Sequence, residues 1–189
     1  MRLARVGLAL GVALFIAAPA MAKQATSAQA GELVRLLGMD KAGVLTANAM
    51  LSQNPAMAAL PQTQRTCMGG VISSNFNTVT ARHLVTQLGD QGSEHISAWK
   101  TFSATPAGND FIASFASQAE AMLPGGSGKP REPDPKFKAE HEAFAATPAF
   151  TTLISALGPQ LQPPEQDQAQ MLQQMQQRCG FKLPGQPAA

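Results

Sequence analysis

The chain contains one Thr-Pro element twice, and this repetition limits the folds that are open to it. The stretch FSATPAGNDFIASF at residues 102–115 returns as FAATPAFTTLISAL at residues 144–157. In each copy a phenylalanine ends one segment, and a threonine and a proline follow before a second apolar run. Threonine is a good helix N-cap, and proline fits the first helical turn, where its missing N–H has no intrahelical partner. Because proline also keeps the preceding residue out of the helical region, each copy predicts two helices joined at a corner.

The corner residues can be assigned directly. Thr105 and Thr147 are the expected caps, and Pro106 and Pro148 are the expected first helical residues. A fainter third copy at residues 51–60, LSQNPAMAAL, offers asparagine as the cap. The element is therefore a bent helix pair, and its simplest purpose is packing.

Apolar residues recur at helical spacing through most of the chain. The predicted helices cover residues 28–39, a segment that Asp40 caps and that ends before Asn54-Pro55, and residues 64–88, 93–102 and 165–179. Tyrosine is absent and Trp99 is the only tryptophan, whereas a β-sandwich uses many aromatic and β-branched residues. The sequence predicts an all-α fold, a single-domain irregular bundle of short bent helices with one long central helix and one disulfide.

The long helix of residues 64–88 has two notable features. Its apolar stripe recurs at spacings of three and four, at Met68, Ile72, Phe76, Val79 and His83. Gly69 and Gly70 lie within this helix, where each glycine costs about 1 kcal/mol relative to alanine. A kink or a close contact with another helix would account for them.

Residues 1–22 have the features of a secretory signal peptide. Two arginines precede an apolar run at residues 6–18, and small residues of the A-x-A type end at Ala22. The run of 13 residues is shorter than the roughly 20 needed to span a bilayer, so a retained membrane anchor is the less favoured alternative. We expect cleavage after Ala22, a periplasmic location without membrane attachment, and one helical domain over residues 23–189.

Loss of the signal peptide makes the chain formally neutral. Residues 1–22 hold two arginines and no acidic residue, so the 14 basic residues of the full chain become 12, equal to the 12 acidic ones. The remaining charges are scattered and form no basic stripe along the sequence. We therefore expect no nucleic-acid partner.

Cys67 and Cys179 are the two cysteines of the chain. An even number of cysteines without CxxC spacing, in a chain bound for an oxidising compartment, favours one structural disulfide over two reduced thiols. In the last predicted helix Met171, Met175 and Cys179 recur every fourth residue. The disulfide should therefore fasten the apolar stripe of this otherwise polar helix to the long central helix.

A Pro- and Gly-rich loop at residues 124–135 separates the two copies of the repeat. Such a composition cannot bury itself and predicts a solvent-exposed loop. Its charged residues, Lys129, Arg131, Glu132 and Asp134, form a candidate partner-binding site. The alternative is a tolerated insertion without function.

Histidines and methionines offer weaker candidate sites. Carboxylates adjoin imidazoles at Glu94-His95 and at Glu140-His141-Glu142, but neighbouring residues point to different helix faces, and metal sites need three or four convergent ligands. Met171 and Met175 could bind Cu(I), although their spacing equally suits core packing. No GxSxG turn and no unpaired cysteine is present for nucleophilic catalysis. We expect no metal, no cofactor and no enzymatic activity.

The corner Phe102-Ser-Ala-Thr-Pro-Ala-Gly108 has an aromatic-x-x-Ser/Thr-Pro-x-Gly pattern. Together with the opening stretch ELVRLLGMDKAGVL, it resembles a family of small secreted, all-helical bacterial domains of unknown function. The resemblance covers about residues 32–112, and the second copy departs from it by placing Phe150 where the glycine would be. It implies an all-helical periplasmic fold and supplies no catalytic residues.

Export, a cross-linked scaffold and the lack of an assembled catalytic set favour a non-enzymatic protein that binds a protein partner. One form of this hypothesis is an inhibitor or immunity protein against a secreted toxin or cell-wall hydrolase. The alternative is a periplasmic protein that binds a small ligand or a metal between its helices.

Overall fold

The computed structural model describes residues 23–123, 129–158 and 165–181, and this part of the chain forms helices without strands. The α-helices are α1 (Ser27–Leu36), α2 (Met39–Gln53), α3 (Pro55–Ala58), α4 (Gln62–Leu88), α5 (Gly92–Ser103), α6 (Pro106–Met122), α7 (Lys138–Ala145), α8 (Pro148–Ala156) and α9 (Glu165–Cys179). Two short 3-10 helices, η1 (Gly89–Gln91) and η2 (Pro135–Phe137), precede α5 and α7. The prediction of an all-α fold with one long helix and one disulfide is confirmed. The predicted signal peptide and residues 124–128 of the predicted loop lie outside the described residues.

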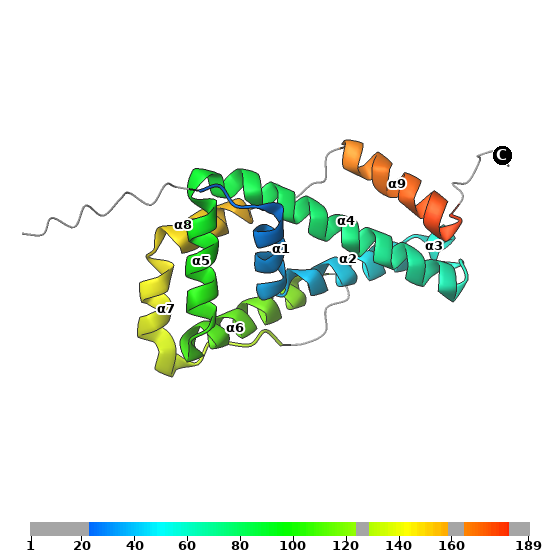
Figure 1. The fold of residues 1–189 in the computed structure, drawn as a ribbon. Coiled ribbons are helices and arrows are strands. Elements are labelled where there is room, and N and C mark those ends of the chain that lie inside the picture. The colour runs from blue at the N-terminus through cyan, green and yellow to red at the C-terminus, as the bar shows by residue number, and fades with distance from the viewer. Residues whose placement is uncertain (1–22, 124–128, 159–164, 182–189) are drawn as a thin grey trace, which may run out of the picture.

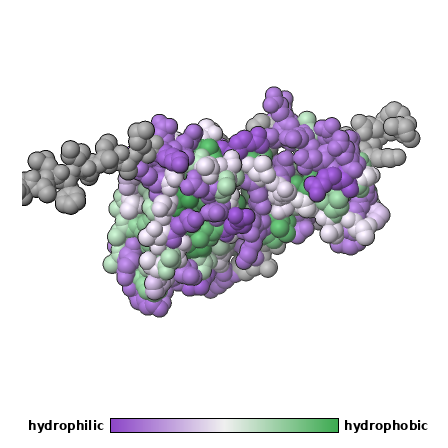
Figure 2. All heavy atoms as spheres, viewed as in Figure 1, coloured by the Kyte–Doolittle hydropathy of each residue, from purple (hydrophilic) through white to green (hydrophobic). Residues whose placement is uncertain are grey.

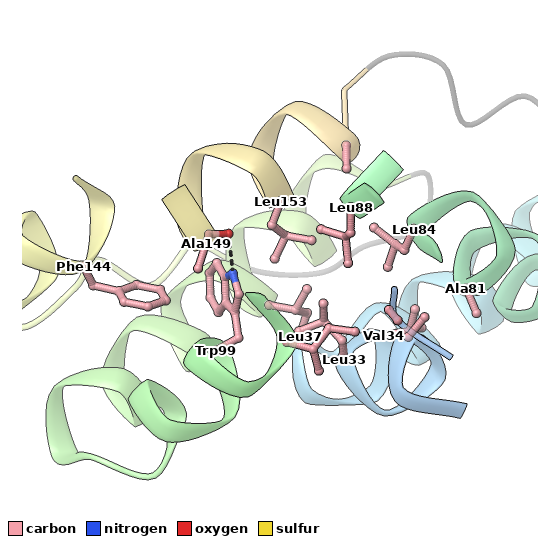
Figure 3. Close-up of a cluster of buried hydrophobic side chains, with 14 residues drawn as sticks. Leu33, Val34, Leu37, Ala81, Leu84, Leu88, Trp99, Phe144, Ala149 and Leu153 are labelled. Atoms are coloured by element: carbon pink, nitrogen blue, oxygen red, sulfur yellow. Dashed lines mark hydrogen bonds between the residues drawn. The ribbon is translucent and has the colours of Figure 1, made fainter. Parts of the chain in front are cut away.

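Helix α4, with 27 residues, is the axis of the molecule (Figure 1). Its first half packs with α2 and α9 around one hydrophobic cluster, the methionine core, formed by Ala47, Leu51, Met68, Val71, Ile72, Met175 and Phe181. Its second half packs with α1, α5 and α8 around a larger cluster, the tryptophan core (Figure 3), which includes Leu33, Val34, Leu37, Leu84, Leu88, Ile96, Trp99 and Leu153. Within the described part of the chain, no helix is long and apolar enough to span a membrane.

The buried face of α4 changes along the helix. Met68 and Ile72 are buried, as the apolar stripe predicts, but the later stripe residues Phe76, Val79 and His83 are only half-buried. In the second half the buried side chains are instead Thr80, Ala81, Leu84 and Leu88. The predicted broad buried stripe is therefore confirmed in the first half of α4 and wrong in the second, because the two ends of the helix pack into different cores on different faces.

Each predicted Thr-Pro corner is confirmed. The Thr105 hydroxyl accepts a hydrogen bond from the backbone N–H of Gly108 at 3.0 Å, and the Thr147 hydroxyl accepts one from Phe150 at 3.3 Å. Asn54 caps α3 in the same manner. The predicted cap at Asp40 is wrong.

Helix α2 begins earlier than the sequence suggests. Gly38 adopts a left-handed conformation (φ 70°) that lets the chain turn between α1 and α2, and it takes the N-cap position. Glycine reaches this conformation without steric cost. Asp40 consequently lies inside the first turn of α2.

The two copies of the Thr-Pro element pack against each other. Phe102 and Phe144, which hold equivalent positions in the two copies, stack with ring centroids 3.9 Å apart and an interplanar angle of 13°. Helix α5 of the first copy lies against α8 of the second, and α6 lies against α7. Because α5 corresponds to α7 and α6 to α8, these two contacts are equivalent. A local two-fold axis through the phenylalanine pair produces this arrangement.

Hydrogen bonds obey the same local symmetry. The Trp99 indole N–H donates to the Ala149 carbonyl oxygen at 3.0 Å (Figure 3). His141 holds the position equivalent to Trp99, and its Nε2 donates to the carbonyl oxygen of Ala107, the equivalent of Ala149, at 2.8 Å. The repeat therefore builds two interlocked helical hairpins, each of which caps a backbone carbonyl of the other.

Helix α9 lies along the first half of α4 (Figure 1) and is fastened at both ends. At its C-terminal end Cys179 forms the disulfide with Cys67. At its N-terminal end the buried Asp167 accepts a hydrogen bond from the Arg82 guanidinium at 3.0 Å. Met175 is buried between these two ties, as the sequence predicts.

Candidate binding groove

A groove runs between α1, α2 and α4, whose arrangement is visible in Figure 1. Residues 27–35 of α1, 40–52 of α2 and 62–82 of α4 contribute its lining, and its volume is about 1090 Å³. At 1.5 Å per residue, the contributing part of α4 is about 30 Å long. The groove is therefore long and open rather than a compact cavity.

The lining of the groove is mixed. Val34, Ala47 and Leu51 supply buried apolar surface, and Val44 exposes 49% of its surface. Serine, threonine and asparagine side chains line the α4 wall. Figure 2 shows the same mixture on the face in view, with hydrophilic residues over α4 and α9 and hydrophobic residues in hollows between the helices. Such a surface offers both apolar contacts and hydrogen bonds to one ligand.

Two glycines face open space where they line the groove. A Cβ atom built at Gly31 or at Gly70 would meet no atom within 4 Å, and one at Gly69 would make only an ordinary contact with Leu51. The close helix contact expected at Gly69-Gly70 lies elsewhere, at Gly43, where a Cβ would come within 3.1 Å of the Phe76 ring. Internal packing thus gives no reason for the glycines at 31 and 70. Glycine also serves where a ligand must approach the backbone closely.

Substitution of Gly70 by alanine is expected to raise the free energy of unfolding by about 0.5–1 kcal/mol, because alanine favours the helix interior and its methyl group meets no atom. Gly43→Ala is the matched control, since its methyl group would crowd Phe76 and Asn77. Chemical denaturation of both variants measures the difference. A loss of stability in Gly70→Ala would show that α4 needs the glycine for its own packing.

Three arginines, Arg35, Arg65 and Arg82, line the groove, together with one acidic residue, Asp40. No lysine lines it. Residues 23–189 contain only five arginines and twelve acidic residues. The groove therefore concentrates guanidinium groups, although residues 23–189 as a whole are formally neutral.

The arginines keep part of their hydrogen-bonding capacity. Arg65 donates from Nη2 to Gln62, while its buried Nε has no hydrogen-bond partner. The Arg35 guanidinium makes no hydrogen bond or ion pair with the described residues. It acts through its charge on Glu32, whose pKa is lowered chiefly by the hydrogen bond from Lys100 and further by Arg35. Arg82 binds Asp167 through one nitrogen, and 58% of its side-chain surface is exposed.

The four charged loop residues that the sequence predicts as a partner site have different surroundings in the structure. Arg131 pairs with the buried carboxylate of Asp110, and the backbone N–H of Asp134 donates to the same carboxylate at 2.8 Å. Lys129 and Glu132 are exposed. The loop is thus tied to α6 through Asp110, and its role as a partner site stays a prediction.

Local hydrogen bonds also set the ionisation of Asp134. The Lys136 ammonium lies 2.7 Å from its carboxylate, and the backbone N–H of Lys136 donates to it at 3.0 Å. These bonds hold the pKa of Asp134 below its ordinary value, with the Lys136 side chain as the larger cause. The carboxylate therefore serves to cap η2.

The side chains of His83, Met171 and Met175 take part in hydrogen bonding or core packing. His83 donates from Nε2 to the Ala156 carbonyl oxygen at 3.0 Å, and this bond ties α4 to the end of α8. Met175 is buried in the methionine core, and Met171 packs against that core. Across residues 23–123, 129–158 and 165–181, no three His, Cys, Asp or Glu side chains cluster closely enough to hold a metal ion.

The apolar stripe of α4 does not reveal the groove, because the groove lies along another face of the helix. A signal was nevertheless present. Arg65, Gly69, Ser73, Asn77 and Ala81 recur at spacing four and place small or polar residues on one face of a long helix. Comparisons of the chain with family models, with curated proteins and with solved structures found no match.

Proposed function

We propose that this chain is a non-enzymatic, exported protein that binds a segment of a protein partner in the groove between α1, α2 and α4. An inhibitor or immunity protein against a secreted toxin or cell-wall hydrolase is one form of this proposal. The observation that carries it is the groove itself, which extends along about 30 Å of α4 and retains glycines that internal packing does not require.

The shape of the groove favours a polypeptide over a compact small molecule. Pockets that enclose small ligands bury most of the ligand surface and are mainly apolar. This groove instead extends along about 30 Å of α4, and polar and apolar residues both line it. A peptide segment can follow such a surface with side-chain contacts in the hollows and hydrogen bonds at the rim.

The scaffold around the groove suits a binding protein. The disulfide and the Arg82–Asp167 pair hold α9 against α4. The Thr-Pro corners hold the hairpins around the tryptophan core. A surface that is ordered before binding loses less conformational entropy when the partner arrives.

Site-specific photo-crosslinking tests the proposal. A crosslinker at Ser74, an exposed groove residue, is expected to capture a protein partner in the exporting cell. The same crosslinker at Gln173, which is exposed on α9 outside the groove, is the matched control. Equal capture at both positions, or capture at neither, would contradict binding in the groove.

A pair of substitutions at Gly70 tests the same surface without a crosslinker. Gly70→Trp is expected to fill the groove and reduce partner binding at least tenfold, and Gly70→Ala to reduce it less, because both side chains start in open space and only tryptophan is bulky. Unfolding curves establish that both variants fold. Undiminished binding by a folded Gly70→Trp variant would place the partner elsewhere.

A further inference from the structure

We infer that the partner segment is acidic and that the guanidinium groups of Arg35, Arg65 and Arg82 bind its carboxylates. This inference rests on the proposed function, since it names the chemistry of the segment that the groove holds. It is carried by the distribution of charge over the described residues and by the free hydrogen-bonding capacity of these arginines.

The charge distribution is strongly biased. Three of the five arginines of residues 23–189 line the groove, and Asp40 is the one acidic residue, of twelve in the same range, that does so. The other two arginines are placed elsewhere: Arg131 pairs with Asp110, and Arg178 lies in the last turn of α9. A formally neutral chain thus presents a basic groove, and an acidic segment is its electrostatic complement.

The choice of arginine over lysine adds chemical detail. Guanidinium presents a planar fork of donors that matches the two oxygens of a carboxylate, whereas ammonium acts as a point charge. The Arg35 guanidinium makes no hydrogen bond or ion pair with the described residues, and Arg65 uses one nitrogen, Nη2, for its hydrogen bond to Gln62. A carboxylate beside either guanidinium would accept hydrogen bonds from nitrogens that the chain itself leaves unused, whereas the buried Nε of Arg65 is out of its reach.

The spacing of the arginines indicates separate carboxylates rather than one anion. Arg65 and Arg82 lie 17 residues apart on the same helix, which corresponds to about 25 Å along its axis. A segment that meets both would extend along much of the groove. Val44, which also lines the groove and exposes 49% of its surface, suits an apolar side chain of the same segment.

A nucleic acid or another phosphate polymer fits the groove less well. Double-stranded DNA carries one charge for about every 1.7 Å of its axis, far denser than three arginines spread over this surface. Asp40 would repel such a polymer, and the apolar lining would find no counterpart on its phosphates. An acidic polypeptide with interspersed apolar residues is therefore the favoured occupant.

Two synthetic peptides provide the first test. One contains leucine and glutamate, and the other replaces each glutamate by glutamine. We expect the glutamate peptide to bind the mature, disulfide-bonded protein at least tenfold more tightly, and its affinity to fall as salt increases. Equal affinities for the two peptides would overturn the inference, as would tighter binding of polyphosphate or of a DNA oligonucleotide.

Charge-removing variants provide the second test. Arg35→Gln and Arg65→Gln are each expected to weaken binding of the glutamate peptide about tenfold, while Arg178→Gln, which removes the same charge outside the groove, leaves it unchanged. Arg82 is kept, because its loss would leave the buried Asp167 carboxylate without its partner. Unfolding curves confirm the fold of each variant.

The two proposals fail in different ways. If Gly70→Trp abolishes capture of the cellular partner but Arg35→Gln and Arg65→Gln bind it normally, the groove is the binding site and its occupant is not acidic. If Gly70→Trp captures the partner normally, the proposed function itself is wrong. Weakening by Arg178→Gln as large as that by the groove variants would indicate unspecific attraction and contradict the inference.

Discussion

Replacement of Cys67 and Cys179 by alanine is expected to lower the free energy of unfolding by about 4 kcal/mol. The disulfide joins residues 112 positions apart, so its loss frees most of the chain in the unfolded state. The loss is comparable to the whole net stability of many small domains. The double variant should therefore be partly unfolded at physiological temperature.

Chemical denaturation of the disulfide-bonded wild-type protein, of its reduced form and of the double variant measures this effect. The reduced wild type is the control for the side-chain change, because it lacks the bond but retains both sulfur atoms. Limited proteolysis of the reduced form and of the double variant should cut first in α9, since few of its residues are buried and α4 is its main packing partner. If both thiols of the native exported protein reacted with an alkylating agent, the cross-linked scaffold would be disproved.

Substitution of Gly108 by alanine is expected to cost about 3 kcal/mol or more. A Cβ atom at this position would lie 1.8 Å from the carbonyl oxygen of Phe102 and 2.8 Å from the backbone nitrogen of Ser103. Neither is the flexible end of a side chain, so the corner between α5 and α6 would have to open. Opening it would separate Phe102 from Phe144 and disturb the tryptophan core.

Thermal and chemical unfolding measure the cost, and Gly31→Ala is the matched control, because it adds the same methyl group to a helix where no atom lies within 4 Å. The second corner has Phe150 at the position of Gly108, and its capping hydrogen bond is longer, 3.3 Å against 3.0 Å. Wild-type stability of Gly108→Ala would mean that the first corner can relax to the geometry of the second.

The helices and corners were predictable because their determinants are local. Each corner depends on a threonine, the proline after it and the apolar run beyond it, which lie within a few residues of one another. These residues determine the corner independently of the rest of the fold. The pairing of Cys67 with Cys179 was predictable for a different reason, since two cysteines in an oxidising compartment have only each other. Both predictions are confirmed.

The functional surface was harder to predict because it depends on how distant helices meet. Arg35 lies on α1 and Arg65 on α4, and no sequence spacing shows that both line one groove. The same limit applies to Arg131, which looks like a free loop charge in the sequence but binds the buried Asp110. The position of each helix in the sequence follows from a local pattern. Which helix faces meet in the fold depends on how the two separate cores pack.

The interlocked hairpins around Phe102 and Phe144 bear on the origin of the chain. Tandem duplication and fusion of an ancestral hairpin that dimerised with itself would leave this arrangement, with reciprocal bonds from Trp99 and His141 to the opposite hairpin. After fusion the sequence of each half can change independently. The indole of Trp99 and the imidazole of His141, which hold corresponding positions, are an example. A chain built from two identical copies of this hairpin should therefore fold into the same interlocked pair.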